Sequence, residues 1–253
     1  MASLITSAVV VRTIDYGESD RIVTLVTREH GKLSAIARGA RKSQKRFGAG
    51  LALFGMGEAS LHERPGAELL TLESFDGVRG FPQLLLDVAK VAHGGYACEL
   101  VRELVPPRQP EPEIFDLLVT ILTMLEEGEP RAETLRVFEL RLLDAVGLRP
   151  QLDACIACNT DELDGDGQVF DVRRGGVMCG ACHGNGRRLD GETRAALQRA
   201  QSTALADAGQ VVLSATVNAG CREALSALVT DHLGRTLKSV EFIAKLNQQK
   251  AHV

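Results

Sequence analysis

The sequence predicts an α+β protein in which a small closed β-barrel is followed by an α-helical region with an inserted four-cysteine module. Three observations support this prediction: short β-branched runs with glycine-marked bends before residue 80, apolar residues at helical spacing after Pro82, and two Cys-x-x-Cys pairs. At 253 residues the chain is long enough for one or two domains. We expect domains at residues 1–80 and 81–253, with the module at about 151–188.

The first 80 residues contain five segments with the composition of β-strands, separated by polar turns. These segments are Ala8–Val11, Arg21–Thr27, Lys32–Ala37, Leu51–His62 and Glu68–Phe75. Five short strands suit a small closed barrel, and the OB-fold is the five-stranded barrel that binds nucleic-acid strands. Periodicity alone does not distinguish the OB-fold from an SH3-like barrel.

After Pro82 the apolar residues recur at helical spacing. We expect helices at Leu84–Val105, Pro112–Gly128, Ala132–Val146, Gly191–Leu205, Ala219–Leu233 and Ser239–Leu246. Two adjacent glycines, Gly94 and Gly95, are expected to kink the first of these helices. Gly147 is expected to end the third helix.

The most specific signal in the chain is its two Cys-x-x-Cys pairs, Cys155 with Cys158 and Cys179 with Cys182. Two such pairs at this separation supply four thiolates, enough to close a tetrahedral zinc site. A closed shell of four sulfurs leaves no position for a substrate. We therefore expect one zinc ion with a structural role.

Other uses of these cysteines are weaker hypotheses. Cys179 to His183 also matches a c-type haem attachment pattern, but that interpretation leaves the first pair unexplained. A thioredoxin-like redox pair would lie near a βαβ pattern, and the sequence around both pairs lacks one. Disulfides are typical of exported proteins, whereas a chain without a secretory signal is expected to keep its thiols reduced. Cys98 and Cys221 lie in apolar helical patterns and are expected to be small buried residues.

A cationic stretch is the strongest candidate for a binding site. The net charge is −4, yet no Asp or Glu occurs from residue 30 to residue 57. Arg and Lys bind phosphates and release their counterions, so we expect this stretch to bind DNA. The expected contacts are Lys32, Arg38, Arg41, Lys42, Lys45 and Arg46. Phe47 is expected to stack on a base, and the alternative is a solvated basic loop.

Other classes of function have little support in the sequence. No apolar run approaches the roughly 20 residues that span a membrane, and the N-terminus lacks the basic region of a signal peptide. We expect a cytoplasmic, nucleoid-associated protein without membrane partners. The phosphate-loop, zinc-protease and nucleophile-elbow motifs are absent from the sequence, so we do not expect an enzyme.

Several ordered fragments together resemble the bacterial recombination mediator family RecO along nearly the whole chain. They are DYGESDR at 15–21, TREHGK at 27–32, ARGAR at 37–41, RVFELRLL at 136–143, the cysteine pairs, and HLGRTLKS at 232–239. The resemblance implies an N-terminal OB-fold, a helical domain with a zinc module, binding of single- and double-stranded DNA, and strand annealing. It also implies cooperation with RecR to load RecA onto strands coated by single-strand-binding protein (SSB).

The resemblance assigns one partner contact to the helical domain. RecO proteins capture the acidic, Phe-terminated tail of SSB beside a basic residue that precedes a Phe-Glu-Leu element. That residue is Arg136 in this chain. Two rival hypotheses are a zinc-ribbon transcription factor, reading DNA through Arg173, Arg174, Arg187 and Arg188, and a zinc-dependent nucleic-acid enzyme.

Overall fold

The computed structural model describes residues 3–47, 51–63, 66–163, 168–182 and 186–250; for Gln44 and 247–250 it describes the backbone alone. The chain divides into two compact units. The first unit comprises residues 1–129 and 242–253, and the second comprises residues 130–241.

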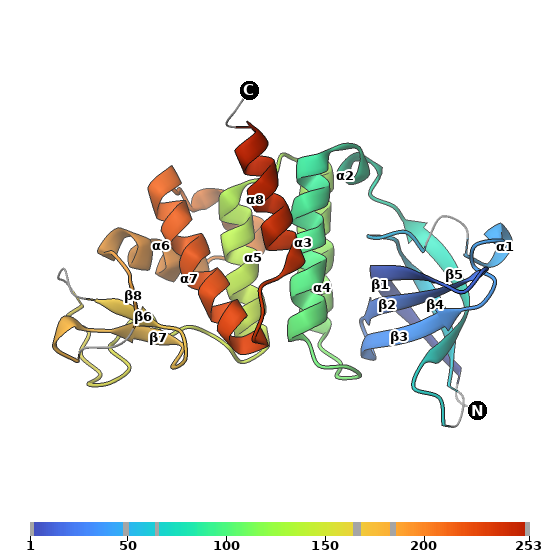
Figure 1. Cartoon of the computed structure of the whole chain (residues 1–253), viewed down its shortest axis with the longest axis horizontal. Helices are drawn as coiled ribbons and strands as arrows, with labels where there is room; N and C mark the ends of the chain where they lie inside the picture. The colour runs from blue at the N-terminus through green and yellow to red at the C-terminus, as the bar shows by residue number, and fades with distance from the viewer. Residues whose placement is uncertain (1–2, 48–50, 64–65, 164–167, 183–185, 251–253) are drawn as a thin grey trace. The chain divides into compact units, whose positions relative to one another are not determined.

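The first unit begins with a five-stranded barrel (blue to cyan in Figure 1). Its strands are β1 (Ser3–Tyr16), β2 (Asp20–Thr27), β3 (Gly31–Ala37), β4 (Met56–His62) and β5 (Leu70–Arg79). The strand order is β1-β2-β3-β5-β4, and the long β1 closes the barrel by pairing with both β2 and β4. Among the described pairs of barrel strands, β3 with β5 is parallel and the others are antiparallel. The predicted five-stranded barrel is confirmed.

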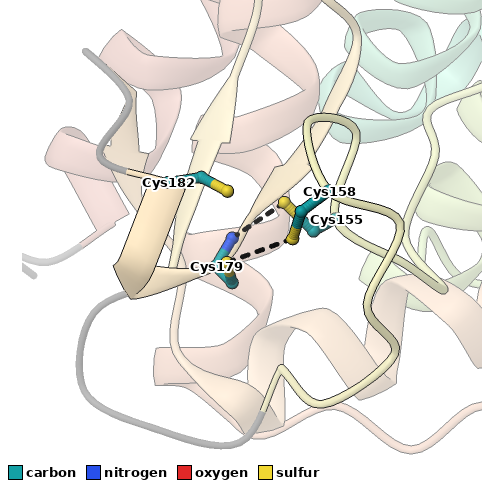
Figure 2. Close-up of side chains that lie close together, drawn as sticks. All are labelled: Cys155, Cys158, Cys179 and Cys182. Carbon is teal, nitrogen blue, oxygen red and sulfur yellow. Dashed lines mark hydrogen bonds between the residues drawn. The ribbon is translucent and has the colours of Figure 1, made fainter.

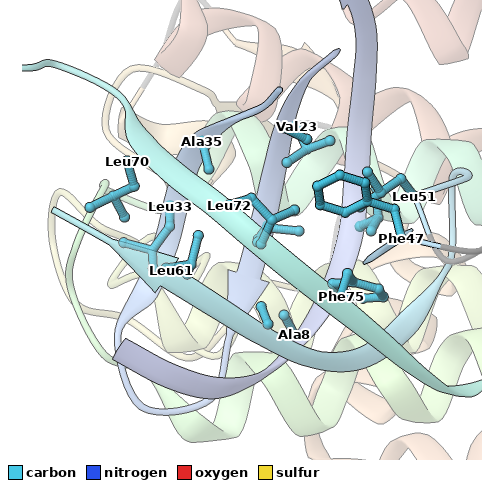
Figure 3. Close-up of a cluster of buried hydrophobic side chains, with 14 residues drawn as sticks. Ala8, Val23, Leu33, Ala35, Phe47, Leu51, Leu61, Leu70, Leu72 and Phe75 are labelled. Carbon is cyan, nitrogen blue, oxygen red and sulfur yellow. The ribbon is translucent and has the colours of Figure 1, made fainter. Parts of the chain in front are cut away.

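Alternating apolar residues fill the barrel, as β-strand periodicity requires. In β3, for example, Leu33, Ala35 and Ala37 are buried and the residues between them are partly or fully exposed. Leu61, Leu72 and other side chains from the remaining strands meet them in one apolar cluster (Figure 3).

The fourth strand is shorter than predicted, because residues 51–55 do not join the ladder. Phe54 instead adopts a left-handed backbone with φ +71°. Its N–H donates to the carbonyl of Val10 at 3.0 Å, and its ring lies against Gly94, where an added Cβ would be 3.1 Å from the ring. The apolar character of Leu51–Phe54 therefore reflects burial outside the sheet.

Before residue 130, the described part of the first unit also contains four helices. Helix α1 (Gln44–Phe47) lies between β3 and β4, and α2 (Pro82–Leu86), α3 (Val88–Leu104) and α4 (Pro112–Glu127) follow the barrel. The single helix expected over Leu84–Val105 is wrong. The chain breaks at Asp87, whose carboxylate caps α3 by accepting the N–H groups of Ala89 (2.7 Å) and Lys90 (3.0 Å). The helix then continues through both glycines to Leu104.

The second unit contains the α-helices α5 (Ala132–Ala145), α6 (Gly191–Ser202) and α7 (Ala215–Leu233), and the 3₁₀ helix η2 (Leu205–Gln210). Helix α8 (Lys238–Lys250) begins in this unit and ends in the first. The predicted helical region is confirmed, and Gly147 follows α5 with φ +76°. None of the helices in the described ranges is long and apolar enough to cross a membrane.

The cysteine module forms a small sheet with strand order β7-β6-β8. Its strands are β6 (Val169–Asp171), β7 (Gly176–Met178) and β8 (Arg187–Arg188), and the short helix η1 (Gly180–Cys182) follows β7. These elements are too short to give a periodic sequence signal, so the sequence does not predict them.

Candidate functional site

The first cysteine pair lies in a tight turn that is fixed to β7. Asn159 adopts a left-handed backbone (φ +59°), which Asn tolerates better than most residues. Its N–H donates to the carbonyl of Cys155 at 2.8 Å, closing the turn around Cys158. The N–H of Ile156 donates to the carbonyl of Val177 at 2.9 Å, which holds the turn against the sheet.

The second pair follows directly from β7. Cys179 is the first residue after the strand, and Cys182 ends η1. The N–H of Cys182 donates to the carbonyl of Cys179 at 3.1 Å, so both sulfurs come from one compact turn. The two turns bring the four side chains together at one point, as Figure 2 shows.

The geometry of the cluster fits a tetrahedral metal ion. All four sulfurs lie within 4.8 Å of one another, and the Sγ atoms of Cys158 and Cys179 are 3.7 Å apart. Four sulfurs at a zinc–sulfur distance of 2.3 Å would be separated by about 3.8 Å in a regular tetrahedron. Four thiolates suit zinc or an iron–sulfur centre and leave no open ligand position.

The polypeptide already favours a negative charge in this cluster. Burial raises the pKa of the Cys155 thiol, but N–H groups directed at its sulfur outweigh burial and lower the pKa to about 6. Two of these donors are the N–H groups of Cys179 (3.4 Å) and Ala157 (3.5 Å). Hydrogen bonding to Cys158 and Cys179 raises the pKa of Cys182 to about 12. A bound cation would favour the thiolate form of every ligand and would release the remaining protons.

The other interpretations of the cysteines receive no support from the geometry. All six cysteines of the chain are described as free thiols. Cys98 in α3 and Cys221 in α7 are buried, as predicted, and are outside the cluster. His183, which the haem pattern requires, lies outside the described residues.

Five of the six predicted DNA contacts occur together on one segment, which we call the basic loop (residues 38–46). The loop begins where β3 ends and includes the first three residues of α1. The side chains of Arg38, Arg41, Lys42, Lys45 and Arg46 are all exposed. The loop therefore presents five cations to solvent within nine residues.

The sixth predicted contact, Lys32, lies apart from this loop at the other end of β3. It is six positions before Arg38 along an extended strand, which corresponds to about 20 Å. Its ammonium group donates to the backbone carbonyl of Arg102, at the C-terminal end of α3. Burial lowers the pKa of Lys32. The side chain connects the barrel to α3 within the first unit.

Phe47 does not face solvent, which corrects the expectation that it stacks on a base. The side chain is 1% exposed and projects into the barrel core, beside Leu51 and Phe75 (Figure 3). The exposed aromatic residue of this barrel is instead Tyr16, which is 55% exposed at the end of β1. Tyr16 lies between two of the predicted strands, in a segment whose composition indicates only a polar turn.

Arg136 lies in α5 and is 5% exposed. One of its terminal nitrogens, Nη2, pairs with Oε1 of Glu139 at 3.0 Å, one helical turn later. Its Nε and Nη1 atoms have no hydrogen-bond acceptor among the described residues. The sequence pattern predicted neither this burial nor the pair with Glu139.

Comparison with known families and proteins covers almost all of the chain. Residues 1–81 match the family model described as recombination protein O N terminal. Residues 85–241 match the model described as recombination protein O C terminal. The two models therefore cover the barrel and nearly all of the helical region with the cysteine module.

Individual relatives are similar over their full length. The DNA repair protein RecO of Anaeromyxobacter dehalogenans (strain 2CP-C) is 47% identical over 244 residues, which is 95% of each chain. RecO of Myxococcus xanthus is 39% identical over 94% of this chain and 96% of that protein. RecO of Symbiobacterium thermophilum is 37% identical over 99% of this chain and 100% of that protein.

Proposed function

Because the chain belongs to the RecO family of DNA repair proteins, we propose that it is a non-catalytic recombination mediator. In this proposal it binds single- and double-stranded DNA and anneals complementary strands. With RecR, it helps to load RecA onto single strands that are coated by SSB. The whole-length similarity to RecO proteins supports a role in repair, and the exposed cations of the basic loop support DNA binding.

The observation that carries the proposal is the exposed basic loop on a barrel whose class binds nucleic acids. Its five cations can donate charge-assisted hydrogen bonds to phosphate oxygens. Binding also releases counterions condensed on the DNA, which is the main source of sequence-independent affinity. A loop of this kind reduces the repulsion between two phosphate backbones, and that repulsion opposes annealing.

Salt titration tests the loop directly. We predict that Arg41→Ala/Lys42→Ala/Lys45→Ala weakens single-stranded DNA binding and flattens the dependence of log affinity on log salt. Each lost phosphate contact should reduce the slope by roughly 0.7, so three should reduce it by about 2. Fluorescence anisotropy of a labelled oligonucleotide between about 30 and about 300 mM salt, a tenfold range, measures the slope.

The matched control removes arginines from the cysteine module. If the basic loop binds DNA, Arg187→Ala/Arg188→Ala should leave the salt slope unchanged. In the structure Arg187 already pairs with Glu223 of the same unit. The opposite pattern, with an unchanged slope in the loop variant and a flatter one in the module variant, would favour the zinc-ribbon hypothesis and refute the loop.

For the cysteine cluster we propose one structural zinc ion, held by Cys155, Cys158, Cys179 and Cys182. The four converging sulfurs and the acidified Cys155 support this assignment. A zinc ion bound there supplies cross-linking of the two turns and no catalytic step, because all four ligand positions are protein sulfurs.

We further propose that Arg136 contributes to binding of the SSB tail. Its Nε and Nη1 groups, without acceptors among the described residues, support a contact to a carboxylate. We predict that Arg136→Ala weakens binding of an acidic peptide ending in Phe by about tenfold or more, consistent with a lost charge-assisted hydrogen bond.

Because Arg136→Ala removes an ion pair from the buried carboxylate of Glu139, the variant is expected to lose stability as well. The double variant Arg136→Leu/Glu139→Leu removes both charges and should restore stability without restoring peptide binding. If the double variant binds the peptide as the natural chain does, Arg136 has no role in tail capture. Peptide anisotropy and urea unfolding measure the two properties.

A further inference from the structure

Exposed aromatic side chains are rare in this protein. The chain has eight Phe, two Tyr and no Trp. Every one of these ten residues lies in the described part of the chain, and only Tyr16 (55% exposed) and Phe242 (45% exposed) reach solvent to this extent. The other eight aromatic residues are buried. The exposure of Tyr16 therefore has no explanation in the packing of the fold.

Tyr16 continues an apolar row on the outer face of the barrel. Ile14 pairs with Ile22 across β1 and β2, and Ile22 pairs with Ile36 across β2 and β3. Directly paired residues point to the same side of a sheet, and neighbouring residues such as Val23 and Ala35 fill the core. The three isoleucines therefore face outward, and Ile14 is 40% exposed. Tyr16 lies two residues after Ile14, on the same face.

The basic loop lies directly against the hairpin that carries Tyr16. The N–H of Arg41 donates to the carbonyl of Ser19 at 3.0 Å. The guanidinium of Arg41 donates to the carbonyl of Glu18 at 3.4 Å and lies 3.8 Å from a carboxylate oxygen of Asp15. The basic loop and the hairpin that carries the exposed ring are therefore in direct contact within the first unit.

The carboxylates of this hairpin are largely engaged with the chain itself. Asp15 pairs with Arg21 at 3.1 Å in addition to Arg41. Asp20 accepts the N–H of Gly39 at 2.8 Å. Glu18 remains as an exposed acid beside five exposed cations of the basic loop. The local balance therefore favours a polyanion.

We infer that Tyr16 is a base-stacking residue for single-stranded DNA whose phosphates contact the basic loop. Single-stranded nucleic acids are held by cationic grooves together with aromatic rings on which bases stack, and such stacking tolerates any base. Bases inside a duplex are not accessible to the ring, so Tyr16 would favour single strands over duplexes. The inference rests on the proposed function, because it needs DNA at the basic loop.

The amino-acid composition allows a direct measurement. Tyr96 is 5% exposed in α3 and is the second of the two tyrosines. In a Tyr96→Phe protein, Tyr16 is the sole strong intrinsic fluorophore. We expect single-stranded oligo(dT) to quench this emission in parallel with binding. An oligonucleotide with the same number of phosphates but abasic sugars should bind without quenching.

Affinity measurements separate stacking from charge. Tyr16→Ser should weaken single-stranded DNA binding about tenfold, as expected for loss of one stacked base. Its salt slope should stay that of the natural chain, because no phosphate contact is lost. Tyr16→Phe should retain affinity, and duplex binding should be unchanged in both variants. Phe242→Ser, which removes the other exposed aromatic ring, is the matched control and should bind as the natural chain does.

The outcomes distinguish this inference from the proposed function. If Tyr16→Ser binds single strands normally and no quenching occurs, while the loop variant still flattens the salt slope, Tyr16 does not stack and the proposed function stands. Failure of the natural chain to bind DNA at all would overturn both. Equal loss of single-strand and duplex affinity in Tyr16→Ser would also overturn the stacking role.

Discussion

Individual polar residues hold the basic loop in place even though its side chains repel one another. Asp20 accepts the N–H of Gly39 at 2.8 Å. Arg46 donates to the carbonyl of Arg38 at 2.6 Å, which directs one guanidinium back to the loop's own backbone. Gly39 has φ +66°, a conformation that favours glycine. The loop is therefore held by specific contacts at both ends while its other cations remain exposed.

The carboxyl group of Asp20 gives a pH prediction at this scale. Its pKa lies below the ordinary value of 3.8, first because the N–H of Gly39 donates to the carboxylate and then because of the Ser19 hydroxyl and the Arg38 charge. A lowered folded-state pKa means that this contact stabilises the fold above the unfolded-state pKa. The stabilisation is lost as the pH falls through the folded-state value.

We predict that the amide signal of Gly39 in an NMR titration moves with a midpoint below 3.8. In Asp20→Asn the side-chain oxygen still accepts the hydrogen bond, but the signal should no longer titrate. Asp20→Ala should shift the Gly39 signal at neutral pH toward that of an unstructured amide. A midpoint at or above the ordinary value would show that the Gly39 contact does not favour the carboxylate.

Among the elements, α1 shows why some functional positions could not be predicted from sequence. Its four residues are too few for a periodic pattern. Phe47 stands next to Lys45 and Arg46 in sequence, but the turn directs its ring into the barrel and leaves the cations exposed. The cationic stretch itself was predictable because charge is read directly from composition. The direction of one ring was not, because it depends on the closed barrel.

Longer elements were predictable where one physical signal dominated. β-branched runs bounded by turn residues located the strands, and helical spacing located α4, α5 and α7. The break at Asp87 was missed because the nearby glycines are the stronger breakers by propensity. In the structure Gly94 instead makes room for the ring of Phe54, a contact between residues 40 positions apart. Tertiary packing thus decided what local sequence could not.

Across the whole molecule, the two candidate sites belong to different compact units. The basic loop and Tyr16 belong to the first unit, and the four cysteines belong to the second. Cysteine spacing predicted the cluster because ligand geometry at a metal is nearly independent of the surrounding fold. This separation leads to the expectation that the metal affects the stability of one unit and leaves DNA contacts of the other intact.

We predict that Cys182→Ser loses its zinc and lowers the melting temperature, because structural zinc contributes apparent binding energy on the order of 10 kcal/mol that also acts as folding energy. Cys221→Ala is the matched control: this thiol is buried in the same unit and lies outside the four-cysteine cluster, so it is not a ligand candidate.

Metal analysis, calorimetry and DNA anisotropy on the same preparations measure the three consequences. Cys182→Ser should bind single-stranded DNA with nearly natural affinity below its melting temperature, whereas the control should keep both zinc and stability. A Cys182→Ser protein that lost the metal but melted as the natural chain does would refute the structural role. Loss of DNA affinity in a still-folded Cys182→Ser protein would instead show that the second unit contributes to the DNA site, because no residue of the basic loop has changed.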